Sequence, residues 1–271
     1  MEAAVQDRIR ISIDALGVAE VCLARPDKMN ALDFAMFDAI AAAIDQLKSE
    51  RGLRAVVLHG EGRAFCAGLD MGRMDKIAAA GEGGFRDLRP RSHGTMNSAQ
   101  YVAQGWRELV VPVIAAVHGV AFGGGLQVAL GADIRLISAD LKMSVMEVKW
   151  GLVPDMAGIV LMRGLLRDDV VRELTYTGRV VDAEEAVQLG LATRVCADPL
   201  AAAREMAAGI AQRSPDAVRA AKRLLNQAAA GTGDAALLQA ESNEQVALMG
   251  APNQVEAVRA NLEKRAPVFH G

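Results

Sequence analysis

Short apolar runs alternate with longer amphipathic segments along the first two thirds of the chain. Runs rich in Val, Ile and Leu predict buried strands over residues 18–24, 54–60, 113–118, 134–139 and 143–145. Apolar residues at helical spacing predict an amphipathic helix over residues 33–48, with one face formed by Phe37, Ile40, Ile44 and Leu47. Strands that alternate with helices indicate an α/β fold with crossover connections.

The last third of the chain has a different pattern. Ala-rich segments punctuated by proline and glycine predict helices over residues 182–189, 199–212, 215–229, 234–249 and 252–264. We therefore divide the chain into an α/β core, residues 1–200, and a helical C-terminal part, residues 201–271. Residues 72–105 fit no regular pattern, which is typical of either a functional loop or a solvated one, with room for a short helix.

Composition excludes several classes of protein. A chain of 271 residues with 52% hydrophobic and 23% charged residues can bury the core of an ordinary globular protein. A net charge of −3 gives no basic field for nucleic acid. Three scattered cysteines and a polar N-terminus without a signal peptide predict a reduced, cytoplasmic protein. The uncharged run 109–132 is long enough to span a bilayer, but its proline, histidine, glutamine and glycines favour a soluble strand, turn and helix.

Two glycine-containing segments carry the candidate chemistry. The sequence PVIAAVHGVAFGGG, residues 112–125, ends in three glycines where a predicted strand meets a helix. Such a junction leaves backbone N–H groups free and lets a ligand approach the main chain. The segment AFCAGLD, residues 64–70, follows another predicted strand. Together the two segments predict an oxyanion site made from backbone N–H groups.

These segments, with RPDKMNAL at residues 25–32, resemble the enoyl-CoA hydratase/isomerase (crotonase) superfamily across residues 10–265. The resemblance implies an α/β crotonase-like spiral of ββα units, with the acyl-CoA site in the core and a helical C-terminal part that supports a homotrimer or hexamer. It implies a small-molecule acyl-CoA thioester as substrate. It implies no metal and no redox cofactor, coenzyme A being part of the substrate, and no nucleic acid or membrane as partner.

The resemblance also assigns roles to residues. The N–H groups of Leu69 and Gly124 would form the oxyanion hole. Hydratases of the family carry two carboxylates, and the first falls at Gln127 in this chain. An amide can position a group but cannot act as a general base. Glu147 matches the second carboxylate and is our candidate for the catalytic base.

Asp155 has two interpretations. Dienoyl-CoA isomerases of the family carry an aspartate at the matching place, which makes Asp155 a candidate partner acid, with Gln127 orienting it or the substrate. An aspartate before Met156 is also a good helix N-cap. The sequence leaves both interpretations open.

Further residues match segments that border the substrate. Arg25 and Lys28 lie where the family approaches the adenine and phosphates of CoA, and cationic side chains suit phosphate. Trp150 would line the acyl pocket, although core packing explains it equally well. The complete set of substrate-binding candidates is Arg25, Lys28, Ala67, Asp70, Gly123 and Trp150.

We expect an enoyl- or dienoyl-CoA isomerase, because one base that removes and returns a proton suffices to shift a double bond. The first alternative is an enoyl-CoA hydratase, with water held by Glu147 and Asp155. The others are a thioester hydrolase or dehalogenase that uses Asp155 or the loop residue His93, and a non-catalytic acyl-CoA binder.

Overall fold

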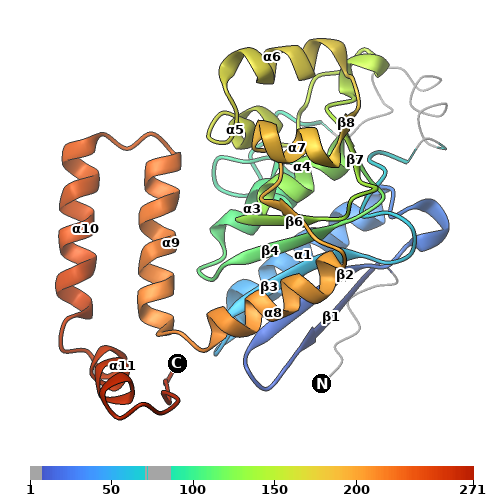
Figure 1. The fold of residues 1–271 in the computed structure, drawn as a ribbon. Helices are drawn as coiled ribbons and strands as arrows, with labels where there is room; N and C mark the ends of the chain where they lie inside the picture. Colours follow the sequence, from blue (N-terminus) through green and yellow to red (C-terminus); the bar gives the residue numbers. More distant parts are fainter. Residues whose placement is uncertain (1–7, 71, 73–86) are drawn as a thin grey trace.

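A six-stranded β-sheet forms the centre of the computed structural model, which describes residues 8–70, 72 and 87–271 (Figure 1). Its strand order is β1-β2-β3-β4-β6-β9, and every neighbouring pair is parallel except β1 and β2. A smaller sheet has the order β5-β7-β8. The strands are β1 Ile9–Ile13, β2 Val18–Leu23, β3 Ala55–Gly60, β4 Val113–Val117, β5 Val120–Phe122, β6 Ile134–Ile137, β7 Lys142–Ser144, β8 Val181–Asp182 and β9 Arg194–Val195.

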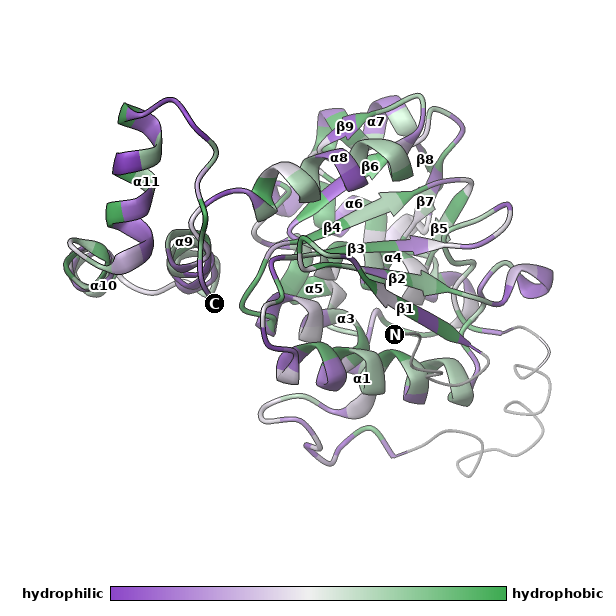
Figure 2. Ribbon diagram, turned by 90° about the horizontal axis from the view of Figure 1, so that it is seen from below, coloured by the Kyte–Doolittle hydropathy of each residue, from purple (hydrophilic) through white to green (hydrophobic). Residues whose placement is uncertain are grey.

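Helices cover both faces of the larger sheet. Figure 2 shows α1 and α3 on one side of the strands and α8 on the other. The helices are α1 Phe34–Ser49, α3 Ser98–Glu108, α4 Gly124–Gly131, α5 Gly158–Met162, α6 Asp168–Thr177, α7 Ala183–Leu189, α8 Pro199–Ala211, α9 Pro215–Ala229, α10 Asp234–Leu248 and α11 Pro252–Leu262, with 3-10 turns η1 Pro26–Lys28 and η3 Glu147–Trp150.

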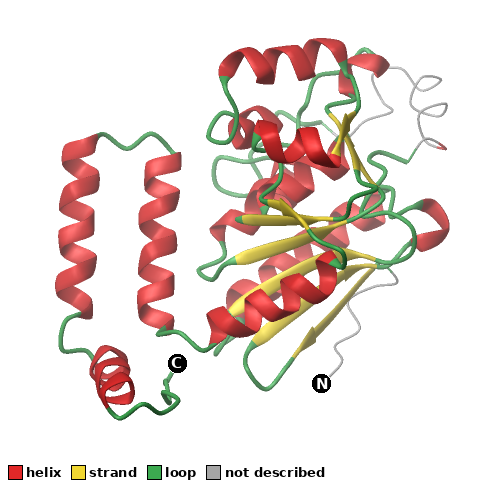
Figure 3. Cartoon of the chain, in the orientation of Figure 1, coloured by secondary structure: helices red, strands yellow, loops and turns green. Residues whose placement is uncertain are grey.

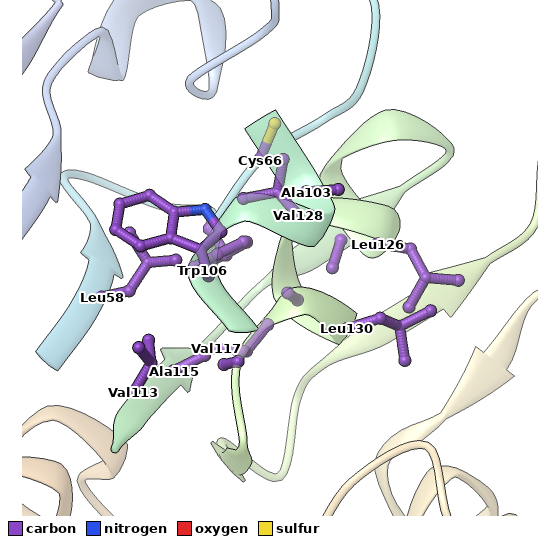
Figure 4. Close-up of a cluster of buried hydrophobic side chains, with 14 of the residues drawn as sticks. Leu58, Cys66, Ala103, Trp106, Val113, Ala115, Val117, Leu126, Val128 and Leu130 are labelled. Carbon is purple, nitrogen blue, oxygen red and sulfur yellow. The ribbon is translucent and has the colours of Figure 1, made fainter. Parts of the chain in front are cut away.

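The two faces of the sheet bury two hydrophobic clusters. The larger cluster lies between the sheet and α1, α3 and α4, and the fully buried Trp106 sits in it beside Leu58 and Val113 (Figure 4). The indole N–H of Trp106 donates to the carbonyl oxygen of Val102 over 3.0 Å, so this buried polar group is satisfied. The smaller cluster packs Ala203 and Ala207 of α8 against β2, β3, β4 and β6. Parallel strands buried on both faces explain the continuous apolar runs in the sequence.

The predicted strands and helices are confirmed to within a few residues. The predicted helix 33–48 is α1, and Asp33 is its N-cap, since its carboxylate accepts from the N–H of Met36 over 2.8 Å. The uncharged run 109–132 contains β4, β5 and α4. Among the described residues, none of the helices combines the length and apolar composition that crossing a membrane requires.

Several elements were not predicted. Helix α3 begins in the stretch 72–105, where the sequence left room for a short helix without placing one, and the described part of that stretch is residues 72 and 87–105. Asn97 starts α3 with a reciprocal capping box to Gln100, a short signal that the apolar periodicity did not show. Strand β1 and helix α6 were also missed, although Ile9 and Ile11 alternate with polar residues and the buried residues of α6 recur at helical spacing.

The last three helices form an arm that projects from the sheet (Figures 1 and 3). Helix α8 packs on the sheet, so a division at residue 200 falls inside it and the arm begins with α9. The buried Lys222 of α9 joins the arm to the core: its Nζ donates to the carbonyl oxygen of Val111 and to Asp133, each over 2.7 Å. The arm exposes the apolar side chains of Leu225, Leu238, Val246, Met249, Val255, Val258 and Leu262.

Candidate active site

The two glycine-containing segments of the sequence meet at one point of the fold. Cys66 and Ala121 form a parallel bridge, in which the Cys66 N–H donates to the carbonyl of Val120 and the Phe122 N–H donates to the carbonyl of Cys66, each over 3.1 Å. A side chain at Gly125 would collide with the Cys66 carbonyl oxygen, so glycine permits this approach. The predicted convergence of these segments is therefore present in the structure.

The backbone N–H of Leu69 is oriented by a second bridge. Leu32 donates its N–H to the carbonyl of Gly68 over 2.7 Å and accepts from the N–H of Asp70 over 3.1 Å. In this parallel bridge, Gly68 and Asp70 make the two hydrogen bonds to Leu32, and Leu69 itself makes neither. The N–H of Leu69 therefore faces away from Leu32. That N–H donates to no acceptor among the residues that the structure describes.

Gly124 supplies the second N–H that donates to no acceptor in the described part of the chain, because it is the first residue of α4 and the first turn of a helix has unpaired donors. Gly68, which precedes Leu69, has a φ of +87°, and a Cβ there would lie 2.5 Å from the Phe122 carbonyl oxygen and 3.7 Å from the Gly124 nitrogen. The backbone beside Leu69 therefore packs directly against the start of α4. Two free N–H groups at such a junction can stabilise an oxyanion.

Glu147 brings a carboxylate to the same junction. It begins the 3-10 turn η3, just after β7, and the small sheet pairs β7 with β5, the strand that leads to the glycines. A Cβ at Gly123 would lie 3.2 Å from Oε1 of Glu147, so the carboxyl group rests on the start of α4. Burial raises the pKa of Glu147 above its usual value, and the charge of Asp155 adds to that increase.

Gln127 contacts both the carboxylate and the turn beyond it. Its Nε2 donates to Oε1 of Glu147 over 2.6 Å. Its Oε1 accepts from the N–H groups of Met156 and Gly158 over 2.9 and 2.8 Å. The side chain is buried, and its hydrogen bonds go to Glu147 and to backbone N–H groups; the expected hydrogen bond to Asp155 is not among them in the described part of the chain.

Asp155 is not a helix cap, and that interpretation was wrong. Helix α5 begins at Gly158, and its N-cap is Ala157, whose φ is +65° and which makes no side-chain cap. The left-handed residue delays the helix by two positions, which leaves the carboxylate of Asp155 free of the helix terminus. Burial raises the pKa of Asp155, and its charge acts on Glu147. The ionisation of Asp155 therefore affects the pKa of Glu147.

The cations before the site are placed differently from each other. Arg25 is largely buried, and its guanidinium pairs with Asp70 over 2.7 Å and with Asp33 over 3.5 Å. It thereby ties Asp70, the neighbour of Leu69, to the start of α1. Lys28 is exposed, and its charge helps to lower the pKa of Asp70. Arg25 therefore forms ion pairs, whereas Lys28 forms none with the described residues.

Asn30 was quoted within the family motif but received no role from the sequence. It is buried with a φ of +55°, and its side chain makes three hydrogen bonds. Its Oδ1 accepts from the N–H of Arg25 over 2.8 Å, and its Nδ2 donates to the carbonyls of Glu61 and Ala64 over 3.0 and 2.9 Å. Asparagine is a residue that tolerates a left-handed turn, and its position just before a helix was the signal from which the sequence could have indicated this linking role.

The remaining candidates differ in their surroundings. Ala67 donates its N–H to the carbonyl of Met29 over 2.9 Å, which fixes the segment before Leu69. Trp150 is 43% exposed at the end of η3, so core packing does not account for it. Leu32 and Met156, which the sequence did not single out, press on Gly124: a Cβ there would lie 2.9 Å from Cδ1 of Leu32 and 2.8 Å from Sδ of Met156.

The histidines are engaged elsewhere. The His93 ring stacks on Tyr101 of α3 with centroids 3.9 Å apart, and its Nδ1 lies 3.0 Å from Oγ of Ser92. His118 is partly exposed, and its Nε2 lies 2.8 Å from the Gly62 carbonyl oxygen. His59 pairs with Glu20 over 3.1 Å.

Comparison with known proteins agrees with this geometry. A dienoyl-CoA isomerase of Dictyostelium discoideum is 29% identical over 266 residues, covering 94% of this chain and 88% of the relative. A carnitinyl-CoA dehydratase of Salmonella typhi is 32% identical over 260 residues, covering 94% and 95%. A crystal structure of an enoyl-CoA hydratase from Bacillus anthracis superposes with a TM-score of 0.86 at 28% identity, covering 97% and 98%. The enoyl-CoA hydratase/isomerase family model matches residues 14–271. The chain therefore belongs to the enoyl-CoA hydratase/isomerase family and is an acyl-CoA enzyme with the crotonase fold.

Proposed function

We propose that this acyl-CoA enzyme is an enoyl-CoA isomerase, which moves a carbon–carbon double bond relative to the thioester. The observation that carries the proposal is the pairing of one buried carboxylate, Glu147, with an amide, Gln127, beside two free backbone N–H groups. A single base that takes a proton from one carbon and returns it to another is sufficient for this reaction.

The proposed reaction has two proton transfers. With a 3-enoyl-CoA, the Glu147 carboxylate removes a proton from carbon 2, and the C–H electron pair moves toward the thioester carbonyl. The resulting enolate oxygen is stabilised by the N–H groups of Leu69 and Gly124, an interaction that typically contributes about 10²–10³ in rate for each donor. The protonated Glu147 then returns the proton to carbon 4, and the double bond forms between carbons 2 and 3. No redox cofactor or metal takes part, and coenzyme A enters only as part of the substrate.

A dienoyl-CoA is the second substrate class for the same site. Asp155 lies close enough to Glu147 for its charge to raise the pKa of that group, and its own pKa is raised by burial. A relative at 29% identity is named a dienoyl-CoA isomerase. Two acids with raised pKa values can transfer protons at two separated carbons, as a shift of two conjugated double bonds requires.

Hydration is the competing function, and the same two carboxyls favour it. Glu147 and Asp155 could together hold and activate a water molecule, and the similar proteins include an enoyl-CoA hydratase and a carnitinyl-CoA dehydratase. Hydration differs from isomerisation because an oxygen atom of water becomes part of the product.

Proton NMR of the purified enzyme in D₂O distinguishes the two reactions. The enzyme is given 3-enoyl-CoA, 2-enoyl-CoA and 3,5-dienoyl-CoA in parallel. A shifted double bond with deuterium at carbon 2 or 4, and no 3-hydroxyacyl-CoA, is the expected result. Formation of 3-hydroxyacyl-CoA from 2-enoyl-CoA would replace the isomerase by the hydratase. Binding of all three thioesters without turnover or exchange would contradict both.

We also propose how substrate and subunits bind. The exposed Lys28 contacts the CoA phosphates, whereas Arg25 acts through Asp70, because two carboxylates already satisfy it.

The apolar side chains on α9, α10 and α11 pack against further copies of the chain in a homotrimer or a hexamer, since helix α10 has no buried residue of its own. Size-exclusion chromatography with light scattering tests this assembly.

A further inference from the structure

The amide of Gln127 has a fixed orientation. Its oxygen accepts from two backbone N–H groups, those of Met156 and Gly158, and an amide nitrogen cannot replace an acceptor there. These two N–H groups converge on one oxygen because Ala157 between them is left-handed. The nitrogen end of the amide must therefore face Glu147, and it donates to Oε1 over 2.6 Å.

The two oxygens of Glu147 consequently have different surroundings. Oε1 accepts a hydrogen bond from Gln127, which lowers the proton affinity of this oxygen relative to Oε2. Oε2 is buried and has no hydrogen-bond partner among the described residues. A buried polar atom without a partner in a native protein calls for an explanation, and a substrate group that occupies the site would supply the partner.

We propose that Gln127 is a positioning residue that makes Oε2 the only oxygen of Glu147 that exchanges protons with the substrate. The inference rests on the proposed function, in which Glu147 transfers protons. The O–H bond forms at Oε2 as the C–H bond breaks, and the same O–H bond breaks when the proton returns. One atom thus serves both steps, and the Glu147 carboxyl does not have to rotate between them.

A glutamate at position 127 would change this arrangement. One of its oxygens could still accept from Met156 and Gly158, but the other would meet Oε1 of Glu147 at about the present 2.6 Å. Two carboxylates at such a distance share one proton and titrate as a pair. The amide at Gln127 keeps Glu147 as a single titrating group on this side of the site.

The test compares Gln127→Met, Gln127→Glu and a matched control, Gln212→Glu, at the exposed C-terminal end of α8. The first measurement is the ¹³C titration of the Glu147 carboxyl in glutamate-labelled protein without substrate, assigned by difference from Glu147→Gln. The second is the pH dependence of deuterium exchange into the acyl chain. The NMR titration needs no turnover, so it tests the positioning even if the isomerase proposal fails.

Loss of the Gln127 donor should move the Glu147 titration and the acidic limb of the exchange profile upward by about one pH unit in Gln127→Met, because a hydrogen bond to a charged group disappears. In Gln127→Glu the titration should split into two coupled steps, whereas Gln212→Glu should match the parent. If Gln127→Met fails to fold, Gln127→Glu carries the test, since it retains an acceptor for both backbone N–H groups. A Gln127→Glu protein that folds and titrates like the parent would overturn the proposal.

Discussion

The oxyanion half and the carboxylate half of the site are built from different chemical parts. The oxyanion half consists of backbone N–H groups at Leu69 and Gly124, held together by close approaches of the main chain at Gly68 and Gly125. The carboxylate half consists of the side chains of Glu147, Gln127 and Asp155, whose charge states depend on burial and on one another. The first half should therefore respond to changes of shape, and the second to changes of charge.

Neutralising Glu147 should have the largest effect. Glu147→Gln removes the base but can keep a hydrogen bond with Gln127, so kcat for isomerisation should fall by about 10²–10⁴ while the fold is retained. The matched control is Glu205→Gln on the exposed face of α8. Full activity of Glu147→Gln would exclude this residue as the base.

The same substitution should stabilise the protein at neutral pH. The pKa of Glu147 is raised in the folded state, so the parent loses stability as pH rises from the unfolded pKa through the folded one. The uncharged variant escapes this loss. Thermal unfolding at pH 4 and pH 8 should show a gain for Glu147→Gln over the parent that is larger at pH 8.

Distorting the oxyanion half should have the next largest effect. Gly68→Ala places a methyl group 2.5 Å from the Phe122 carbonyl oxygen at a φ that disfavours alanine, so the Leu69 N–H should turn away from that of Gly124. Loss of one donor predicts a decrease of about 10²–10³ in kcat. Gly72→Ala is the control, because among the described residues its Cβ would meet only Asp70 Oδ1, at 3.4 Å. Equal activities of the two variants would show that the close contact between Gly68 and the Phe122 carbonyl is not needed for catalysis.

Removing the charge of Asp155 should shift the pH profile. That charge raises the pKa of Glu147, so in Asp155→Asn the pKa of Glu147 falls and the acidic limb of kcat/KM moves to lower pH. With a 3-enoyl-CoA the plateau should be nearly unchanged, whereas with a 3,5-dienoyl-CoA it should fall if Asp155 transfers the second proton. A profile identical to that of the parent with both substrates would remove Asp155 from the mechanism.

Changing the side chain of Leu69 should have the smallest effect. Leu69→Ala keeps the backbone N–H that faces the oxyanion, so kcat should stay within about threefold of the parent. Steady-state kinetics with one enoyl-CoA suffices as the measurement. A much larger loss would mean that the Leu69 side chain, and not only its backbone, holds the substrate.

Local patterns in the sequence predicted most of the secondary structure and the backbone half of the site. Glycine at positions 124 and 125 is visible in the sequence, and the close approach it permits follows from its missing side chain. Helix α3 escaped prediction because its start depends on a capping box and its surroundings have no clear period. Asp155 looked like a cap because the left-handed turn at Ala157, which moves the helix start, leaves no trace in the residue types.

By itself, the sequence determined the alternation of strands and helices, the helical C-terminal part and the residue types at the site, because these depend on neighbours along the chain. The tertiary structure decided how those residues are paired. The Gln127 amide reaches Glu147 and two backbone N–H groups of a distant turn, and Arg25 reaches Asp70. Hydrogen bonds and ion pairs between segments 20 or more residues apart form only where packing brings the segments together, so no local pattern could have specified them.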